Sequence, residues 1–144
     1  MIEHVEKLLK QLQIDYQKEE QTLFVSFLLQ EFPFGVMIEI NEAQSLMNFV
    51  TRLPILFKEE AISNAYIACN VVNKQLVEGC FYCDTHGEVW FNESFNYGNS
   101  KASINTLKYI LSNINQCMEH VGKLIYQLSI DEITLEQYFD YIFV

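Results

Sequence analysis

The spacing of apolar residues between Ile104 and Leu128 is the clearest pattern along the chain. Apolar residues recur there at alternating steps of three and four positions: Ile104, Leu107, Leu111, Ile114, Met118, Val121, Ile125 and Leu128. A helix brings such positions onto one face, so the spacing predicts a long amphipathic helix. A second apolar column of Ile110, Cys117 and Leu124 lies beside the first, which makes the face wide enough to meet both a sheet and a neighbouring molecule.

The first half of the chain predicts a short helix followed by three strands. Apolar residues at helical spacing predict a helix over residues 2–12, and alternation predicts strands over residues 22–30, 36–40 and 46–53. We expect Pro33 to lie in the turn 31–35 and Pro54 to end the third strand, because proline cannot donate to a ladder. The short connections favour an antiparallel meander.

The second half predicts a helix, a hairpin and two further helices. A helix starts near Glu59 and ends before Gly79, and two strands follow around the turn 84–87. After the long helix, Ser129 and Glu132 have the spacing of a capping box, which predicts the start of a separate last helix. The chain ends in an apolar, aromatic tail that must pack on the body or on a partner.

These elements predict one α+β domain spanning residues 1–144. Its architecture is an antiparallel sheet of about five strands with helices packed on it, in the order helix, three strands, helix, two strands and two helices. We expect a body at residues 1–128 and a C-terminal aromatic helix or tail at residues 129–144. Hydrophobic residues make up 50% of the chain and aromatic residues 14%, which is enough for a sizeable core and too much for a disordered chain.

Charge and cysteine content narrow the partners and the compartment. Nine basic and nineteen acidic residues give a net charge of -10, and Arg52 is the only arginine, so we expect neither nucleic acid nor anionic membranes as partners. The charged first ten residues do not resemble a secretory signal, and no apolar run is long enough to span a membrane. Four cysteines without such a signal indicate reduced thiols and a cytoplasmic protein.

The candidate chemical groups do not combine into an active site. Cys80 and Cys83 have the Cys-x-x-Cys spacing, but in a strand the two side chains point to opposite faces and no second such pair completes a zinc site. Asp84, His86 and Glu88 alternate in a hairpin turn and make a weak ligand set. Neighbouring carboxylates and isolated histidines lack catalytic partners, and glycine-rich phosphate loops are absent. We therefore expect no catalytic, cofactor-binding or metal-binding residues.

One stretch of the sequence resembles a known family. It comprises Asn73, Leu76, Gly79, Phe81, Asp84, Gly87, Glu88, Val89 and Phe91, followed by a polar loop and a long apolar helix. In this stretch and in its order of elements, over about residues 8–128, the chain resembles the YbjN-domain family with its type III secretion chaperone-like fold. The resemblance implies a bacterial protein of the kind described as candidate regulators, related to folds that dimerise and hold segments of partner proteins. It implies no catalytic residues and does not cover the aromatic tail.

The resulting hypothesis is a non-enzymatic protein-binding module of the bacterial cytoplasm, chaperone-like or regulatory, without a cofactor and forming a homodimer. We expect its binding surface to combine an exposed sheet face with the aromatic tail, at Phe49, Thr51, Trp90, Tyr138, Tyr141 and Phe143. Two alternatives stay open. One is a thiol redox or metal-binding protein centred on Cys80 and Cys83, and the other is a small-ligand sensor with an apolar pocket between helix and sheet.

Overall fold

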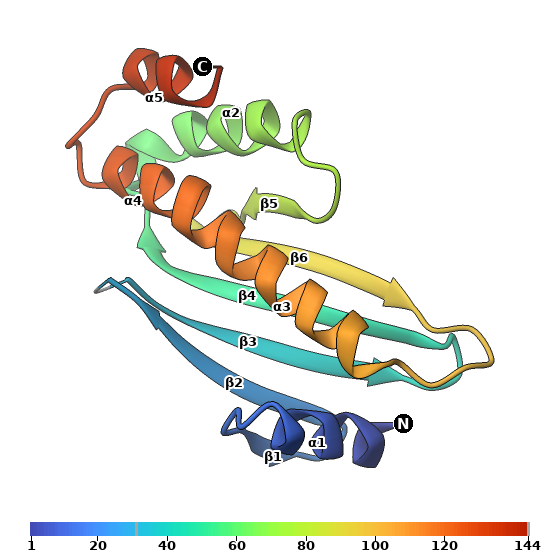
Figure 1. Ribbon diagram of the computed structural model, residues 1–144. Helices are drawn as coiled ribbons and strands as arrows, with labels where there is room; N and C mark the ends of the chain where they lie inside the picture. Colours follow the sequence, from blue (N-terminus) through green and yellow to red (C-terminus); the bar gives the residue numbers. More distant parts are fainter. Residues whose placement is uncertain (31, 144) are drawn as a thin grey trace.

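The computed structural model describes residues 1–30 and 32–143 and has an α+β fold with a six-stranded antiparallel sheet (Figure 1). The helices are α1 (Ile2–Gln11), α2 (Ile62–Asn73), α3 (Ile104–Cys117), α4 (Lys123–Ser129) and α5 (Leu135–Ile142). The strands are β1 (Gln17–Glu19), β2 (Thr22–Leu29), β3 (Phe32–Asn41), β4 (Leu46–Leu56), β5 (Cys80–Cys83) and β6 (Glu88–Asn96). The predicted fold class and element order are confirmed. Strand β1 was not predicted because all three of its residues are exposed and show no apolar alternation.

The sheet has the strand order β1-β2-β3-β4-β6-β5, and all neighbours are antiparallel. The three predicted strands form the expected meander as β2, β3 and β4, and β1 adds a fourth strand at its edge. The chain then crosses through α2 and returns as β5 at the far edge, so that β6 runs between β5 and β4. Glycines at positive φ, Gly79 and Gly87, stand before β5 and before β6. Each allows a turn that other residues rarely adopt, which accounts for both glycines of the matched stretch.

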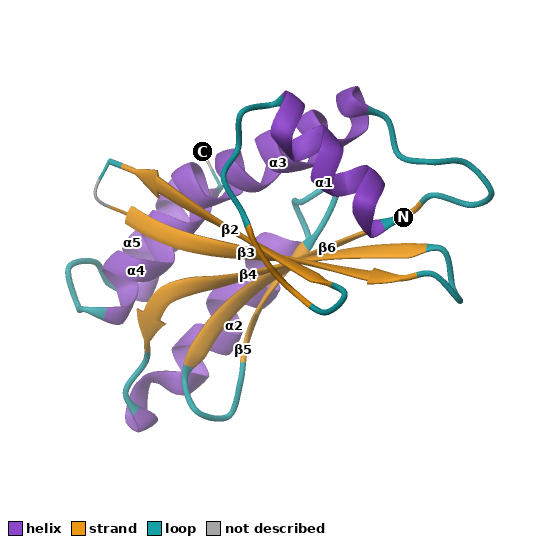
Figure 2. Cartoon of the chain, turned by 90° about the horizontal axis from the view of Figure 1, so that it is seen from below, coloured by secondary structure: helices purple, strands orange, loops and turns teal. Residues whose placement is uncertain are grey.

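One face of the sheet carries the helices. In Figure 1, α3 crosses the sheet, α1 covers the side of β1 and β2, and α2 and α5 lie beyond β5. Figure 2 shows α1 and α3 on the same side of the strands. Alternate residues of the strands point to this side and form one hydrophobic core with the helices, as the buried pattern of β3 illustrates. Among the described residues, no helix is long and apolar enough to cross a membrane.

The predicted long helix is present but contains a π-helical turn. Residues Met118–Gly122 form this turn between α3 and α4. A Cβ atom at Gly122 would lie 3.4 Å from the Phe32 ring and 3.5 Å from Leu53, so the helix approaches the sheet closely there. Ile110 and Cys117 of the second apolar column are buried within the same molecule. The expectation that this column provides spare surface for a neighbour is therefore wrong for those two residues.

The two prolines lie inside strands rather than in turns. Pro33 belongs to β3 and Pro54 to β4, so the predicted turn at 31–35 and the predicted strand end at Pro54 are wrong; Glu31 lies outside the described residues. The fixed φ of proline is compatible with an extended strand, so the backbone can continue through it. What proline removes is the donor for a neighbouring strand, and the pairing of β3 with β4 ends before these residues.

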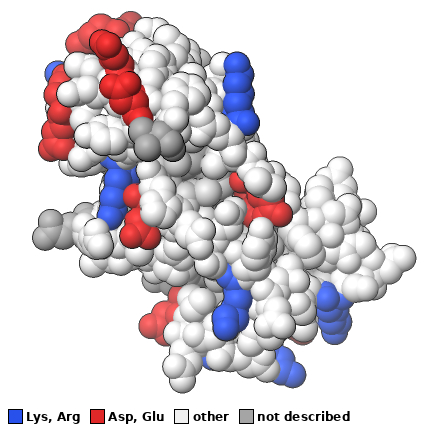
Figure 3. All heavy atoms as spheres, turned by 45° about the horizontal axis from the view of Figure 1, so that its top comes forward, with Lys and Arg blue, Asp and Glu red and all other residues white. Residues whose placement is uncertain are grey.

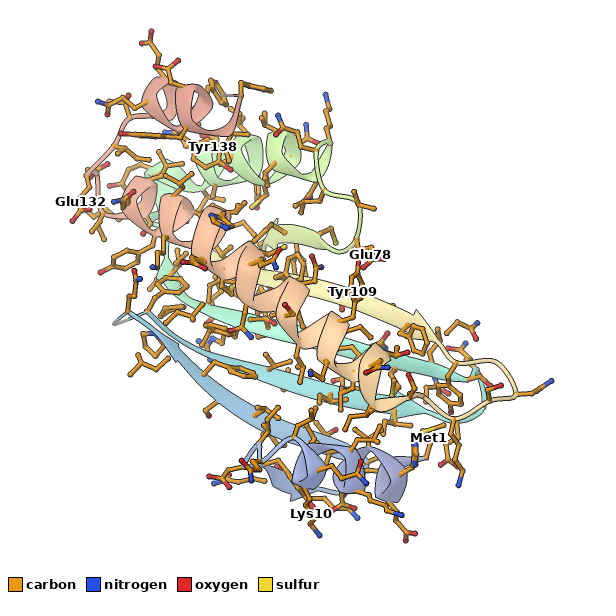
Figure 4. The ribbon with its side chains drawn as sticks, viewed as in Figure 1. Met1, Lys10, Glu78, Tyr109, Glu132 and Tyr138 are labelled. Atoms are coloured by element: carbon orange, nitrogen blue, oxygen red, sulfur yellow. The ribbon has the colours of Figure 1, made fainter. Side chains whose placement is uncertain are left out.

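The last helix begins later than predicted and packs on the body. The capping box is formed by Thr134 and Gln137. Ser129 is still the last residue of α4, and its hydroxyl donates back to the Tyr126 backbone oxygen at 2.6 Å instead of capping a following helix. Tyr138 of α5 is completely buried, and its hydroxyl donates to the backbone oxygen of Ala68 in α2 at 2.9 Å (Figure 4). Val144 lies outside the described residues.

Candidate protein-binding surface

The face of the sheet opposite the helices carries apolar side chains that no described helix covers. We call this surface the open face, and its apolar members are Phe24, Leu28, Pro33, Met37, Leu46, Val50, Pro54, Leu56, Tyr82 and Trp90. The exposed fraction of Leu28 is 70% and that of Leu56 is 67%. Antiparallel sheets often leave one face to solvent, but that face is then usually polar. Here polar residues such as Glu39, Arg52 and Ser94 share the face with these apolar ones, and exposed apolar residues grouped on one face make a candidate interaction site.

The expected exposed positions Phe49 and Thr51 lie on the wrong face. Both side chains are completely buried, because Phe49 pairs with Glu93 and Thr51 with Phe91 on the side of the helices. Trp90 is one register step away, opposite Arg52, and points to the open face. Strand alternation thus separates Trp90 from the two residues with which it was grouped. Sequence reasoning missed Leu28 and Leu56, although strand alternation places them on the opposite face from their neighbours Leu29 and Ile55, which pack on the core.

Trp90 sits in a fixed cluster of aromatic and charged side chains. The Tyr82 ring stacks on it with 6.4 Å between centroids, and the Arg52 guanidinium lies 5.7 Å from its centroid. Arg52 also forms an ion pair with Glu88 at 2.6 Å. The indole Nε1 donates to Asp84 at 3.2 Å. These contacts orient a flat, half-exposed aromatic surface of the kind enriched in protein interfaces.

Asp84 organises the hairpin turn rather than a metal site. Its Oδ1 accepts the backbone N–H groups of His86 at 2.9 Å and of Glu88 at 3.0 Å. Partial burial acts to raise the pKa of Asp84, but these bonds and the Trp90 bond outweigh it and lower the pKa. Within residues 1–30 and 32–143, no group of three His, Cys, Asp or Glu side chains is placed to hold a metal ion.

The two cysteines of the Cys-x-x-Cys stretch lie on opposite faces of β5. Cys80 is exposed on the open face, whereas Cys83 is half-buried and near the buried Cys69 of α2. Burial raises the pKa of Cys83 to about 11 and that of Cys69 to about 12, which keeps both thiols protonated at neutral pH. A reactive thiol needs a lowered pKa. The position of the two thiols on opposite faces and the raised pKa of Cys83 therefore argue against a cooperating Cys-x-x-Cys pair.

The outer edge of the sheet at β5 is closed by a side chain. Asn73 at the end of α2 donates from Nδ2 to the Phe81 backbone oxygen and accepts from the Phe81 backbone N–H, both at 2.7 Å. The amide thereby replaces a neighbouring strand at this residue. Native proteins protect sheet edges against pairing with other chains, and Asn73 has this effect here. A partner is consequently not expected to add a strand at β5.

The aromatic tail forms a surface separate from the open face. Tyr141 and Phe143 are exposed, at 61% and 64%, while Tyr138 is buried within the molecule. Helix α5 contacts α2 and α4, which belong to the covered side of the sheet. The predicted single surface joining sheet and tail is therefore wrong, and Tyr138 is a core residue. Figure 3 shows acidic side chains gathered at the end of the molecule that carries α5, and wide uncharged areas elsewhere.

A small acidic cavity lies between β6 and α3. It has a volume of about 250 Å³, and Glu78, Glu93 and Tyr109 contribute to its lining (Figure 4). Glu93 is only 5% exposed and accepts a bond from Asn113 at 2.9 Å. Burial raises the pKa of Glu93, the Asn113 bond opposes this rise, and the nearby Glu78 carboxylate adds to it. The sequence did not predict this cavity, because Glu93 occupies a position where alternation calls for an apolar residue.

Two larger cavities lie where β3 and β4 separate. One, of about 590 Å³, opens on the open face and is lined by Ser26, Phe27, Pro33, Phe34, Gly35, Arg52, Leu53, Pro54, Ile55 and Leu56. The other, of about 410 Å³, lies beside α4 and is lined by Gln30, Phe32, Pro33, Pro54, Lys123, Tyr126, Gln127 and Glu132. Pro33 and Pro54 belong to both linings. We call the two cavities together the β3–β4 groove.

Comparisons with known proteins agree on the fold. No protein-family model matches the sequence, and no curated protein matches it at a significant level. The crystal structure of YbjN from E. coli, described as a proposed transcription regulator, is similar over 92% of this chain and 93% of that one, with a TM-score of 0.68 and 9% identity. A chain in the structure of the HopA1–SchA chaperone–effector complex is similar over 80% of this chain and 87% of that one, with a TM-score of 0.54 and 13% identity. The protein thus has a YbjN-like fold of the type III secretion chaperone-like kind.

Proposed function

We propose that this protein is a non-enzymatic, chaperone-like or regulatory module that binds another protein through the open face. The observation that carries the proposal is the uncovered apolar side of the sheet, on which Leu28 and Leu56 are each about two-thirds exposed. Burial of apolar area favours association by about 25 cal/mol per Å² before entropy costs. The fold similarity to a chain of a chaperone–effector complex supports a protein as the partner.

The net charge and the cysteines support two further parts of the proposal. A net charge of -10 favours a basic or amphipathic protein over nucleic acid. All four cysteines lie in the described part of the chain and are free thiols, which suits the bacterial cytoplasm. We also propose that the protein forms a homodimer, in which the exposed Tyr141 and Phe143 are the contact residues.

The test is a comparison of variants in native-cell crosslinking. Leu28→Glu/Leu56→Glu places two charges on the open face, and Val77→Glu is the matched control, because Val77 is 97% exposed on the loop between α2 and β5. We expect wild type and Val77→Glu to retain one stoichiometric protein partner and the double variant to lose it. Retention of the same partner by all three chains would reject the open face as the binding surface.

Molar mass in solution tests the homodimer separately. Light scattering of wild type should give twice the chain mass, and Tyr141→Ser/Phe143→Ser should give the mass of one chain. A monomeric wild type would remove the homodimer from the proposal and leave the open face unaffected.

A further inference from the structure

The β3–β4 groove follows from the placement of the only two prolines. In the register of the two strands, Met37 pairs with Val50 and Gly35 pairs with Arg52. The same register continued by one step of two residues places Pro33 opposite Pro54. The two strands nevertheless stop pairing at Gly35 and Arg52.

The backbone groups of these prolines face each other across the groove. Within β3, the Ile40 N–H donates to Gln21, so the even-numbered residues face β2 and the odd-numbered Pro33 faces β4. The register of β4 with β6 shifts between Arg52 and Leu56, but the bonds on both sides of the shift agree: the Tyr97 N–H donates to Ser45 before it, and the Phe57 N–H donates to Gly87 after it. Odd-numbered residues of this strand therefore face β6, and the even-numbered Pro54 faces β3. Pro33 and Pro54 would form a hydrogen-bonded pair, but neither has an N–H to donate. The sheet therefore separates at this point.

The separation leaves acceptors and apolar walls facing one space. By the same alternation, the carbonyl groups of Pro33 and Pro54 are directed toward this space. Figure 2 shows β3 and β4 diverging toward these ends. Gly35 adds no side chain to the wall, and a Cβ there would meet nothing nearer than 3.9 Å. The Phe32 ring, in edge contact with Tyr126 at 6.0 Å, borders the cavity beside α4.

We infer that the β3–β4 groove holds an extended segment of a partner protein whose backbone N–H groups donate to the carbonyls of Pro33 and Pro54. This inference rests on the proposed function and names the chemistry of the partner. In an extended segment, successive side chains point to opposite sides. Apolar side chains then contact Leu56 on the open face and, alternately, Phe32 and Tyr126 on the side of α4. The β5 edge offers no such site, because Asn73 closes it.

Charge complementarity favours a segment flanked by basic residues. Within the groove, Arg52 is paired with Glu88, and Lys123 donates to Gln30 at 2.8 Å in a lining that also includes Glu132. The open face further carries the exposed Glu39 without a basic residue among its strand partners. Lys123 keeps its charge, because Gln30 is neutral, but an acidic segment would be repelled by the net charge of -10 of the whole chain.

The probe is a displayed library of peptides of about ten residues with alternating apolar positions, flanked by Lys in one half and by Glu in the other. Selection uses the full-length wild-type chain. We expect enrichment of Lys-flanked peptides, and synthetic versions N-methylated at alternate residues should bind about tenfold more weakly because they lose donors. Absence of any enriched peptide would overturn the inference. The inference would also be overturned if a peptide bound equally well after N-methylation of its odd-numbered residues or of its even-numbered residues.

Three variants place the bound peptide. Gly35→Tyr fills the groove, and Pro33→Val/Pro54→Val restores two donors and lets the strands pair; each should weaken peptide binding about tenfold. Ser94→Tyr is the matched control, since Ser94 is exposed on the open face outside the groove lining, and should bind like wild type. Peptides that bind the groove variants like wild type but not Leu28→Glu/Leu56→Glu would reject the groove and leave the proposed function standing. If Leu28→Glu/Leu56→Glu keeps its partner in native cells, the proposed function itself is rejected.

Discussion

The two faces of the sheet are built from alternate residues of the same strands, yet only one of them is completed by the chain. On the covered face, Phe91 is fully buried and its ring lies 4.8 Å from that of Phe81. On the open face, the adjacent Trp90 is half-exposed and Leu56 is largely exposed. The difference indicates that stability is concentrated on one face, whereas the other is the surface to which the proposed function assigns a partner. It also means that substitutions one residue apart should have very different effects.

The largest expected effect is on the covered face. Phe91→Ala removes a buried ring and should lower the free energy of unfolding by about 3–5 kcal/mol. Leu56→Ala, on the open face, should change it by no more than about 0.5 kcal/mol. Urea denaturation of the two variants measures both values. Similar losses in both would show that the open face is packed in solution and would break the comparison.

A smaller effect is expected where the sheet edge is closed. Asn73→Ala removes two hydrogen bonds to Phe81 and should cost about 1–3 kcal/mol. It also frees the edge of β5, so self-association should rise with protein concentration. Denaturation and sedimentation measure the two effects. Asn70→Ala, at an exposed position of the same helix, is the matched control and should show neither.

The smallest expected effect is a pH dependence at the acidic cavity. Because burial raises the pKa of Glu93, the folded state holds this proton more tightly than the unfolded state. The resulting stability is present below the unfolded-state pKa and is lost as the pH rises through the folded-state pKa. Glu93→Gln should therefore be the more stable chain at neutral pH, with the difference shrinking in acid.

Thermal denaturation across that pH range measures the Glu93 effect. Glu119→Gln removes one acidic group at an exposed position of the π-helical turn and controls for the change in net charge. Equal stability gains in both variants at neutral pH would assign the effect to net charge rather than to the cavity.

The element order could be predicted from the sequence because the core elements carry strong periodic patterns. Strand β1 and the start of α5 could not, since β1 has only exposed residues and a local capping motif at Ser129 matched as well as the true one at Thr134. The binding surface was harder to predict from the sequence than the element order. In β2 and β4 both faces are partly apolar, so alternation alone could not say which set faces the helices, and Phe49 and Thr51 were assigned to the wrong one.

The groove shows a further limit of local patterns. A proline predicts the end of a strand when it is considered alone. Here Pro33 and Pro54 end a pairing instead, and that effect depends on their being opposite each other in a register that joins distant parts of the chain. The same holds for Asn73, whose role depends on its contact with Phe81 across a loop.

The π-helical turn sets the angular phase of everything that follows it along the helix. Each residue of an α-helix turns the chain by about 100°, so deleting one residue of Met118–Gly122 would rotate α4 by about that angle about its axis. Lys123 and Tyr126 would then turn away from the strands they now border. The π-helical turn therefore fixes which side of α4 borders the β3–β4 groove.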